Sequence, residues 1–234
     1  MSGVARDALY RSECTICERV ASDAAKYTMM SSAKSQSQPA VFLDRDGVLI
    51  EDVDLLVDED EAHLLAGVPE ALTTLNAAGF TLVVVTNQPV IARGLATEDE
   101  VQHIHQHLEH RLAAKGAGID AWYYCPHHPH ATLPEYRVDC DCRKPGCGML
   151  LTASREWDID LARSYLVGDR VTDIAAGAAA GCRTVLVKSG KHEAPPIQTA
   201  RAFDRTVKAD HECASLLEAS HWIMQQGVEA QRAA

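Results

Sequence analysis

Two aspartates one residue apart, Asp44 and Asp46, directly follow the apolar run 41–43 and precede Gly47. The run predicts a short buried strand, and the alternation of side chains along a strand places both carboxylates on the same side. Carboxylates this close repel each other unless a cation lies between them, which indicates a hard divalent metal such as Mg²⁺. A solvated Asp-x-Asp turn is the alternative interpretation of this pair by itself.

Polar side chains follow two further predicted strands. Thr86 and Asn87 come after the apolar run 81–85, and Asp169 comes after the run 164–167. In a parallel sheet these chain positions share one edge, which is where open α/β folds bind their ligands. A hydroxyl and amides there can hold a phosphoryl oxygen, and Asp169 is a natural metal ligand facing the aspartate pair. A polar turn is the alternative interpretation of Thr86 alone.

The eight cysteines indicate metal binding before disulfides, because thiols stay reduced inside cells. Three of them and a histidine flank the segment 128–139, which contains two prolines and little apolar periodicity. Three thiolates and an imidazole form a tetrahedral zinc set, and the metal would order a segment that has no other evident staple. We predict structural zinc on Cys125, His127, Cys140 and Cys142, with His128 as the alternative to His127 and Cys147 as a non-ligand.

Two cations, Arg143 and Lys144, directly follow Cys142. The metal loop would therefore aim them at the mouth of the site. There Lys144 can neutralise a phosphoryl group and an attacking carboxylate, while Arg143 binds another anionic group of the substrate. Basic residues on an ordinary surface are the alternative.

Two other groups of potential ligands carry weaker signals. Cys14 and Cys17 have the spacing of half a zinc or redox site, but no second pair lies near them, and we interpret them as incidental thiols. His103, His107 and His110 share a helical face, yet no carboxylate or cysteine completes a ligand set on the same turns. We interpret that face as solvated.

The periodicity of the chain predicts an α/β fold in one domain. Expected strands are 41–43, 81–85, 121–124, 164–167 and 184–187, and expected helices are 67–79, 97–114, 149–157, an alanine-rich helix ending at Gly181, and 214–226. Helices between successive strands favour a Rossmann-like three-layer sandwich around a mainly parallel sheet. We expect residues 1–39 to be a mobile N-terminal extension and 40–234 to be the domain, with its zinc loop at 125–142.

The net charge of -11 and the pI near 5.4 argue against binding to nucleic acid or to anionic membranes. No apolar run approaches the roughly 20 residues of a membrane span, and the N-terminus lacks the hydrophobic region of a signal peptide. We therefore expect a cytoplasmic monomer whose partner is a small-molecule substrate, and neither nucleic acid nor a membrane.

From Val41 to Lys188 the chain resembles the zinc-containing branch of the haloacid-dehalogenase-like phosphatases. That branch holds the D-glycero-D-manno-heptose 1,7-bisphosphate 7-phosphatases and the histidinol-phosphate phosphatase domains. The resemblance is carried by the stretches 44–47, 86–88, 91–94, 123–129, 140–145 and 167–169. It implies a haloacid-dehalogenase-like fold without a large cap domain.

The resemblance also implies roles for individual residues. Asp44 would attack phosphorus to form an aspartyl-phosphate, while Asp46 would protonate the leaving alkoxide and later activate water. Mg²⁺ would be held by Asp44, Asp169 and the backbone carbonyl of Asp46. The remaining assignments are Thr86 and Lys144 for catalysis, Asn87, Gln88, Arg143 and Asp52 for substrate binding, and Asp173 and Arg170 for support of the metal ligands; Asp173 is as apt to cap its helix as to bind the ion.

Two departures from the family pattern concern the substrate. The segment 52–55 replaces a His-Gly-Tyr-type substrate loop, and Pro89-Val90 replaces a small Ser-Gly pair. We predict removal of the 7-phosphate of heptose 1,7-bisphosphate, a step in supplying activated heptose for lipopolysaccharide. Hydrolysis of histidinol phosphate or another small ester is the alternative within enzymes, and a non-catalytic zinc-stabilised binding module is the alternative outside them.

Overall fold

The computed structural model describes residues 37–191 and 202–233. Most of the expected extension, with Cys14 and Cys17, lies outside this part. Its last three residues do not: the Gln38 N–H donates to the Asp158 carbonyl at 3.0 Å, and the Asp160 N–H donates to the Gln38 carbonyl at 3.0 Å. Ser37 and Gln38 are therefore hydrogen-bonded to the segment around Asp158.

A parallel sheet forms the middle of the domain. In the described part of the chain it has six strands in the order β3-β2-β1-β4-β5-β6, and every neighbouring pair is parallel. The strands are Ala40–Leu43 (β1), Thr81–Asn87 (β2), Ala121–Cys125 (β3), Tyr165–Gly168 (β4), Arg183–Val187 (β5) and His211–Cys213 (β6).

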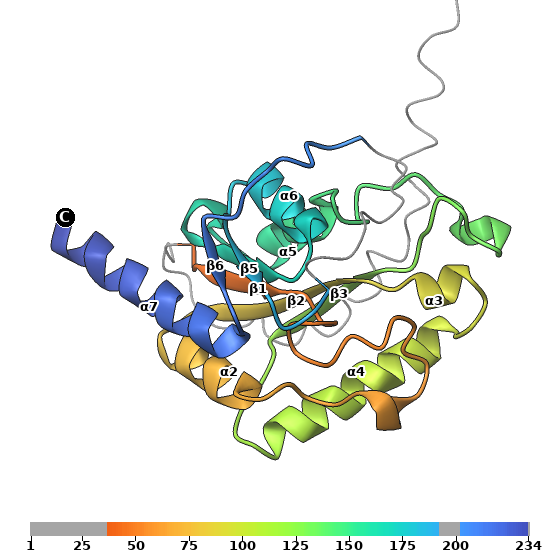
Figure 1. The fold of residues 1–234 in the computed structure, drawn as a ribbon, viewed down its shortest axis with the longest axis horizontal. Helices are drawn as coiled ribbons and strands as arrows, with labels where there is room; N and C mark the ends of the chain where they lie inside the picture. The colour runs from red at the N-terminus through yellow and green to blue at the C-terminus, as the bar shows by residue number, and fades with distance from the viewer. Residues whose placement is uncertain (1–36, 192–201, 234) are drawn as a thin grey trace, which may run out of the picture.

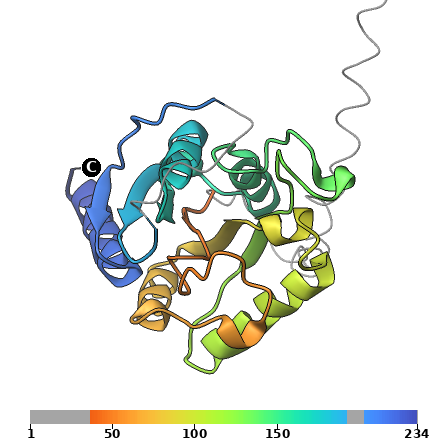
Figure 2. The ribbon, with the colours of Figure 1, turned by 45° about the vertical axis from the view of Figure 1, so that its right-hand side comes forward.

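Helices cover both faces of the sheet, which confirms the three-layer prediction. One face carries α2 (Val68–Ala77), α4 (Glu98–Ala113) and α7 (Leu216–Ala233), and the other carries α5 (Gly148–Trp157) and α6 (Val171–Ala180). Figure 1 shows α5 and α6 above the sheet with α2 and α4 below it, and Figure 2 shows the same layers after rotation. Shorter elements are α3 (Pro89–Ala92) and the 3-10 helices Glu59–Glu61, Pro134–Tyr136 and Leu161–Arg163.

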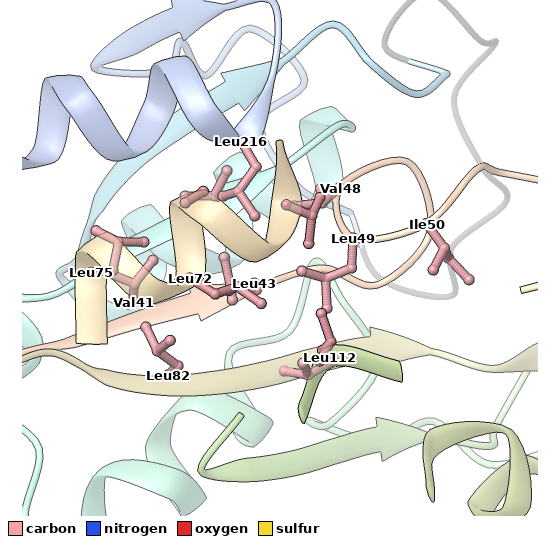
Figure 3. Packing of buried hydrophobic residues seen from close by; sticks show 14 of the residues in the cluster. Val41, Leu43, Val48, Leu49, Ile50, Leu72, Leu75, Leu82, Leu112 and Leu216 are labelled. Carbon is pink, nitrogen blue, oxygen red and sulfur yellow. The ribbon is translucent and has the colours of Figure 1, made fainter. Parts of the chain in front are cut away.

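Alternation along β1 divides the core between the two faces. Val41 and Leu43 pack into the cluster that contains Leu72 and Leu75 of α2, as Figure 3 shows, whereas Phe42 packs on the opposite side with residues of α5. All of these side chains are fully buried. Burial of each contributes about 1.5–3 kcal/mol, so β1 is held firmly from both sides.

One strand was not predicted. Two of the three residues of β6, His211-Glu212-Cys213, are polar and none is fully buried, so neither alternation nor an apolar run marks them in the sequence. They become a strand by pairing with β5, from Val185 with His211 to Val187 with Cys213. This adds a sixth strand to the five that the pattern predicts.

A capping box begins α4, at the start of the helix predicted over 97–114. The Thr97 hydroxyl accepts from the Glu100 N–H at 3.2 Å, and the Glu100 carboxylate accepts from the Thr97 N–H at 2.7 Å. These bonds satisfy backbone donors that the first helical turn leaves open. None of the helices in the described ranges is long and apolar enough to cross a membrane.

The order of the strands reverses at β1, which lies between β2 and β4. On the two sides of such a point in a parallel sheet the connections run in opposite directions, and a crevice opens at the carboxyl ends of the strands there. Asp44 directly follows β1, Asn87 ends β2, and Asp169 directly follows β4. The fold thus brings together the three polar segments that lie far apart in the sequence.

Candidate active site and metal-binding cluster

Asp44 lies at this switch point, just beyond the last residue of β1. Its N–H donates to the Val167 carbonyl at 3.0 Å, which continues the sheet ladder by one residue and fixes the backbone. Its side chain is almost buried and accepts from the N–H of Arg45 at 2.7 Å and from Lys144 Nζ at 3.0 Å. Asp44 is therefore held at the edge of the sheet with a cation beside it.

Lys144 enters the same point from the loop after Cys142. Its side chain is only 2% exposed, and its Nζ contacts Asp44 Oδ1 at 3.0 Å, Asp173 Oδ1 at 2.7 Å and the Val85 carbonyl at 2.8 Å. Burial lowers the pKa of Lys144, but Asp173 and Asp44 outweigh it and raise the pKa to about 12. The ammonium group stays charged and joins two carboxylates.

Three buried carboxylates form a cluster here, and two of them, Asp44 and Asp173, pair with Lys144. Ligand oxygens of Asp44, Asp169 and Asp173 all lie within 4.8 Å of one another. Burial, and then the charges of Asp173 and Asp44, raise the pKa of Asp169 to about 8. Asp169 Oδ1 is buried without a hydrogen-bond partner among the described residues. Since Lys144 compensates only part of the negative charge, the cluster suits a divalent cation bound by oxygen ligands.

The side-chain cluster contains Asp173, which the sequence left open as a metal ligand, while the predicted role of Asp46 is through its backbone carbonyl. The side chain of Asp46 is not in the cluster. Asp173 has a second contact, because its Oδ2 accepts from the Arg170 N–H at 3.0 Å at the start of α6. It thus caps the helix, as the sequence allows, while its other oxygen pairs with Lys144.

Two glycines leave the space that Asp169 occupies. A Cβ atom at Gly190 would lie 2.2 Å from Asp169 Oδ2, and one at Gly47 would lie 2.6 Å from the same oxygen. Gly47 also has φ +78°, a conformation that favours glycine. The Lys191 N–H donates to Asp169 Oδ2 at 2.7 Å, so the segment after β5 holds the carboxylate in place. The sequence pattern did not predict that Gly190 and Lys191 belong to the site.

Asp46 is engaged by a different set of groups. Its carboxylate accepts from Arg45 NH2 at 3.0 Å and from Gln88 Nε2 at 3.0 Å, and the same Gln88 nitrogen donates to Thr86 Oγ1 at 2.9 Å. Burial raises the pKa of Asp46, and the charge of Arg45 opposes that rise. A carboxyl group with a raised pKa at the rim of a site is suited to carrying a proton.

The predicted substrate residues have different surroundings. Asn87 Oδ1 accepts from the Lys144 N–H at 3.0 Å, and Asn87 Nδ2 donates to the Lys144 carbonyl at 3.1 Å, so this side chain fixes the Lys144 backbone. Arg143 is buried, and its NH1 donates to the His127 carbonyl at 2.9 Å. Its Nε has no hydrogen-bond partner in the described structure, which leaves a donor for an anionic ligand.

Asp52, also predicted to contact substrate, is bound to two cations. Its carboxylate accepts from Arg170 NH2 at 3.1 Å and from Lys191 Nζ at 3.2 Å, and Lys191 also pairs with Asp54. These cations offset the acids that the sequence places in segment 52–55. The loop is thereby attached to α6 and to the segment after β5.

The predicted thiol and imidazole ligands form a second cluster. The sulfurs of Cys125, Cys140 and Cys142 are 3.1 to 3.6 Å apart, and His127 Nδ1 is 3.1 to 3.8 Å from each of them. In a tetrahedral site with metal–ligand bonds of about 2.3 Å, the ligand atoms are about 3.8 Å apart. The observed separations equal this value or are slightly shorter. The group can hold a metal ion.

Other candidate ligands lie outside both clusters. His128 Nδ1 accepts from the His130 N–H at 3.1 Å, and Cys147 is the residue before α5. His103 and His110 are exposed and His107 is half-buried, which confirms the solvated face among the described residues. Sequence reasoning overlooked a buried histidine on that helix, His105, although it falls on the apolar stripe.

Comparisons with known proteins agree with this geometry. A family profile described as HAD-hydrolase-like matches residues 141–219. A D-glycero-beta-D-manno-heptose-1,7-bisphosphate 7-phosphatase of Photorhabdus laumondii is 44% identical over 158 residues, which are 67% of this chain and 84% of that protein. The protein of the same name from Escherichia coli K12 is 44% identical over 71% of this chain and 87% of its own length.

Solved structures of heptose bisphosphate phosphatases are also similar to this chain. The chain resembles the D,D-heptose 1,7-bisphosphate phosphatase of B. bronchiseptica, crystallised with magnesium and phosphate, with a TM-score of 0.68 and 34% identity over 80% of this chain and 99% of that one. A second D,D-heptose 1,7-bisphosphate phosphatase, from Burkholderia thailandensis, has a TM-score of 0.55 and 30% identity over 80% of this chain and 99% of its own.

Proposed function

The chain belongs to the haloacid-dehalogenase-like phosphatases, and on this basis we propose that it removes the 7-phosphate of D-glycero-D-manno-heptose 1,7-bisphosphate. The observation that carries the proposal is the buried contact between Lys144 and Asp44 beside the carboxylate cluster. A carboxylate can approach a phosphate dianion only where such charges compensate the repulsion. We further propose that the reaction serves heptose supply for lipopolysaccharide; the monomeric state and cytoplasmic location stay predictions.

The proposed reaction has two steps. An Asp44 oxygen attacks phosphorus, the bond from phosphorus to the ester oxygen breaks, and Asp46 gives its proton to that oxygen. Asp46 then takes a proton from water as the water oxygen attacks the aspartyl-phosphate, which releases inorganic phosphate and restores Asp44. Lys144 stays charged throughout and offsets the negative charge, while Thr86 stabilises a phosphoryl oxygen.

Asp44 and Asp169 would hold Mg²⁺, with the backbone carbonyl of Asp46 as a further ligand and Asp173 within reach. The unpartnered Asp169 oxygen and its raised pKa support this assignment. When bound, the ion supplies electrostatic stabilisation of the phosphoryl charge.

Arg143 is proposed to bind the phosphate that is not cleaved. Its buried guanidinium has an unpartnered Nε, and its position one residue before Lys144 ties the two phosphate sites together. Arginine can grip a phosphate with two parallel hydrogen bonds. Asn87 and Gln88 support the site through Lys144 and Asp46, in addition to any contact with the sugar.

The test of the proposed function is phosphate release by the purified protein with Mg²⁺. Both anomers of heptose 1,7-bisphosphate are compared with histidinol phosphate and common sugar phosphates. A heptose bisphosphate should give the highest kcat/KM, by about tenfold or more over monophosphates, since Arg143 would contact the second phosphate. Preference for histidinol phosphate would overturn the substrate assignment, and absence of hydrolysis of every ester would overturn the enzyme.

Zinc is the proposed ion for the cluster at the end of β3. Replacing Cys140 by serine should remove the metal and lower the melting temperature by roughly 5–10 °C, equal to about 2–3 kcal/mol for a domain of this size. Activity should fall as well, because Arg143 and Lys144 directly follow Cys142. Metal content by mass spectrometry, melting and phosphate release check these three effects.

Cys147→Ser is the matched control, since Cys147 is partly buried and lies outside the cluster. It should retain zinc and activity. Full activity of Cys140→Ser with no zinc bound would show that other contacts hold the loop.

Replacing Gly190 by alanine should weaken Mg²⁺ binding by about tenfold or more, because the new Cβ would displace the Asp169 carboxylate. Calorimetric titration with MgCl₂ measures this directly. Gly118→Ala is the control, as a Cβ there would meet nothing within 4 Å. Equal Mg²⁺ affinity in the Gly190 variant and the natural protein would remove Asp169 from the metal site.

A further inference from the structure

A buried imidazole lies behind the proposed proton donor. His105, on α4, is only 5% exposed, and its Nε2 is 3.3 Å from NH1 of Arg45. The ring stacks on Trp122 with centroids 4.6 Å apart and meets the edge of Tyr124 at 5.7 Å. Two aromatic neighbours therefore set the plane of the imidazole. The proposed reaction uses no part of His105.

The contact fixes the protonation of the ring. A guanidinium has only donors, so Nε2 of His105 must accept and the ring proton must lie on Nδ1. Burial, and then the charge of Arg45, lower the pKa of His105 well below its usual value. The imidazole is thus neutral, and its Nε2 accepts a hydrogen bond from Arg45.

Arg45 has acceptors on every side of its guanidinium. Its Nε and NH2 donate to Asp46 at 3.1 and 3.0 Å, and NH2 also donates to Gln88 Oε1 at 3.0 Å. His105 occupies the remaining nitrogen, NH1. Arg45 is 1% exposed, so the loss of this acceptor would leave a buried donor unpaired. The guanidinium would then reorient toward another acceptor, and the Asp46 carboxylate to which it donates would shift with it.

We propose that His105 is a positioning residue that holds Arg45, and through it Asp46, in the orientation required for proton donation to the leaving oxygen. This inference rests on the proposed function, which assigns the proton transfer to Asp46. A misplacement of about 1 Å in a reacting group costs on the order of 10²-fold in rate. The effect should therefore depend on whether the leaving group needs a proton.

The test compares two esters with leaving groups of different basicity. A sugar phosphate releases an alkoxide, which needs the proton of Asp46, whereas p-nitrophenyl phosphate releases a stable phenoxide, which does not. The measured quantity is kcat/KM, because it reports only steps up to the breaking of the ester bond. His105→Phe keeps an aromatic ring beside Trp122 and removes the acceptor.

His105→Phe should lower kcat/KM for heptose 1,7-bisphosphate by about 10–100-fold and change it less than about threefold for the nitrophenyl ester. His105→Gln, whose amide oxygen can reach the position of Nε2, should recover most of the rate. The shorter His105→Asn should not. If the Phe variant fails to fold, as judged by melting, the Gln and Asn variants decide the question alone.

An equal loss on both esters, or no recovery in His105→Gln, would overturn the inference in favour of a purely structural histidine. Asp46→Asn on the same esters separates this from failure of the proposed function. A leaving-group dependence in Asp46→Asn without one in the His105 variants overturns only the role of His105. No dependence in Asp46→Asn removes Asp46 as the acid and overturns the proposed reaction as well.

Discussion

Replacing Asp44 by asparagine should lower kcat by about 10⁴-fold or more while the protein remains folded. The amide cannot form the phosphorylated intermediate, although it keeps the size of the side chain. Burial raises the pKa of Asp44, with Lys144 opposing and Asp173 adding to the rise, so the carboxylate is not an important source of stability. Without Mg²⁺ the variant should melt at the same temperature as the natural protein or higher, because one of three clustered charges is gone.

Phosphate release, and melting curves with and without Mg²⁺, check both halves of this prediction. Mg²⁺ should raise the melting temperature of the variant less than that of the natural protein, since a ligand is missing. Asp60→Asn makes the same chemical change at an exposed position and should alter neither property. Rates within about tenfold of the natural enzyme would place the nucleophile elsewhere.

Replacing Lys144 by methionine should have the largest effect on stability. Two buried carboxylates, Asp44 and Asp173, would lose their shared cation, and the removal of one partner of a buried ion pair costs about 3–5 kcal/mol. The rate should fall by about 10²–10³-fold, because the charge that offsets the phosphoryl group is lost. Denaturant unfolding and phosphate release measure the two effects.

The stability defect should depend on pH with a definite sign. A carboxylate whose pKa is raised in the folded state binds more protons there than in the unfolded chain, so stability falls as pH rises between the two pKa values. For Asp169 this window runs from its usual 3.8 to about 8, and the loss of Lys144 should raise the pKa of its neighbours further. The variant should therefore be less stable at neutral than at weakly acidic pH, and Mg²⁺ should restore part of the difference.

Two variants complete this test. Lys115→Met removes an exposed lysine and should leave stability unchanged within about 0.5 kcal/mol. Adding Asp173→Asn to Lys144→Met removes one of the unpaired charges and should recover stability but not activity. A lack of recovery in the double variant would contradict the proposed ion-pair energetics.

The sequence was sufficient to predict the strands of the middle of the sheet, because apolar runs mark strands that are covered on both faces. It also predicted the thiol and imidazole cluster, because ligand spacing is a local property of the chain. The short polar strand β6 could not be predicted, since its conformation depends on pairing with β5.

Within the site, the sequence predicted which residues gather but not how they pair. Asp173 meets Lys144 only because β4, α6 and the loop after Cys142 converge, and no spacing along the chain records that contact. His105 is different, because it lies on the same helical stripe as Val101, Ile104 and Leu108. A histidine on that stripe is a signal, readable in the sequence, of a buried polar contact.

The central position of β1 also determines when the site can come into existence during synthesis. The first strand pairs with β2 on one side and with β4 on the other, and the N–H of Ala40 donates to the hydroxyl of a serine 124 residues later. Pairing over such a separation is slow, because the entropy cost of closing a long loop comes before any contact stabilises the pair. Asp44 leaves the ribosome among the first residues of the domain, yet its cluster is complete only after Asp173 has followed. A nascent chain that ends before β4 therefore lacks one neighbour of β1, and the carboxylate cluster cannot form until β4 and the start of α6 have been synthesised.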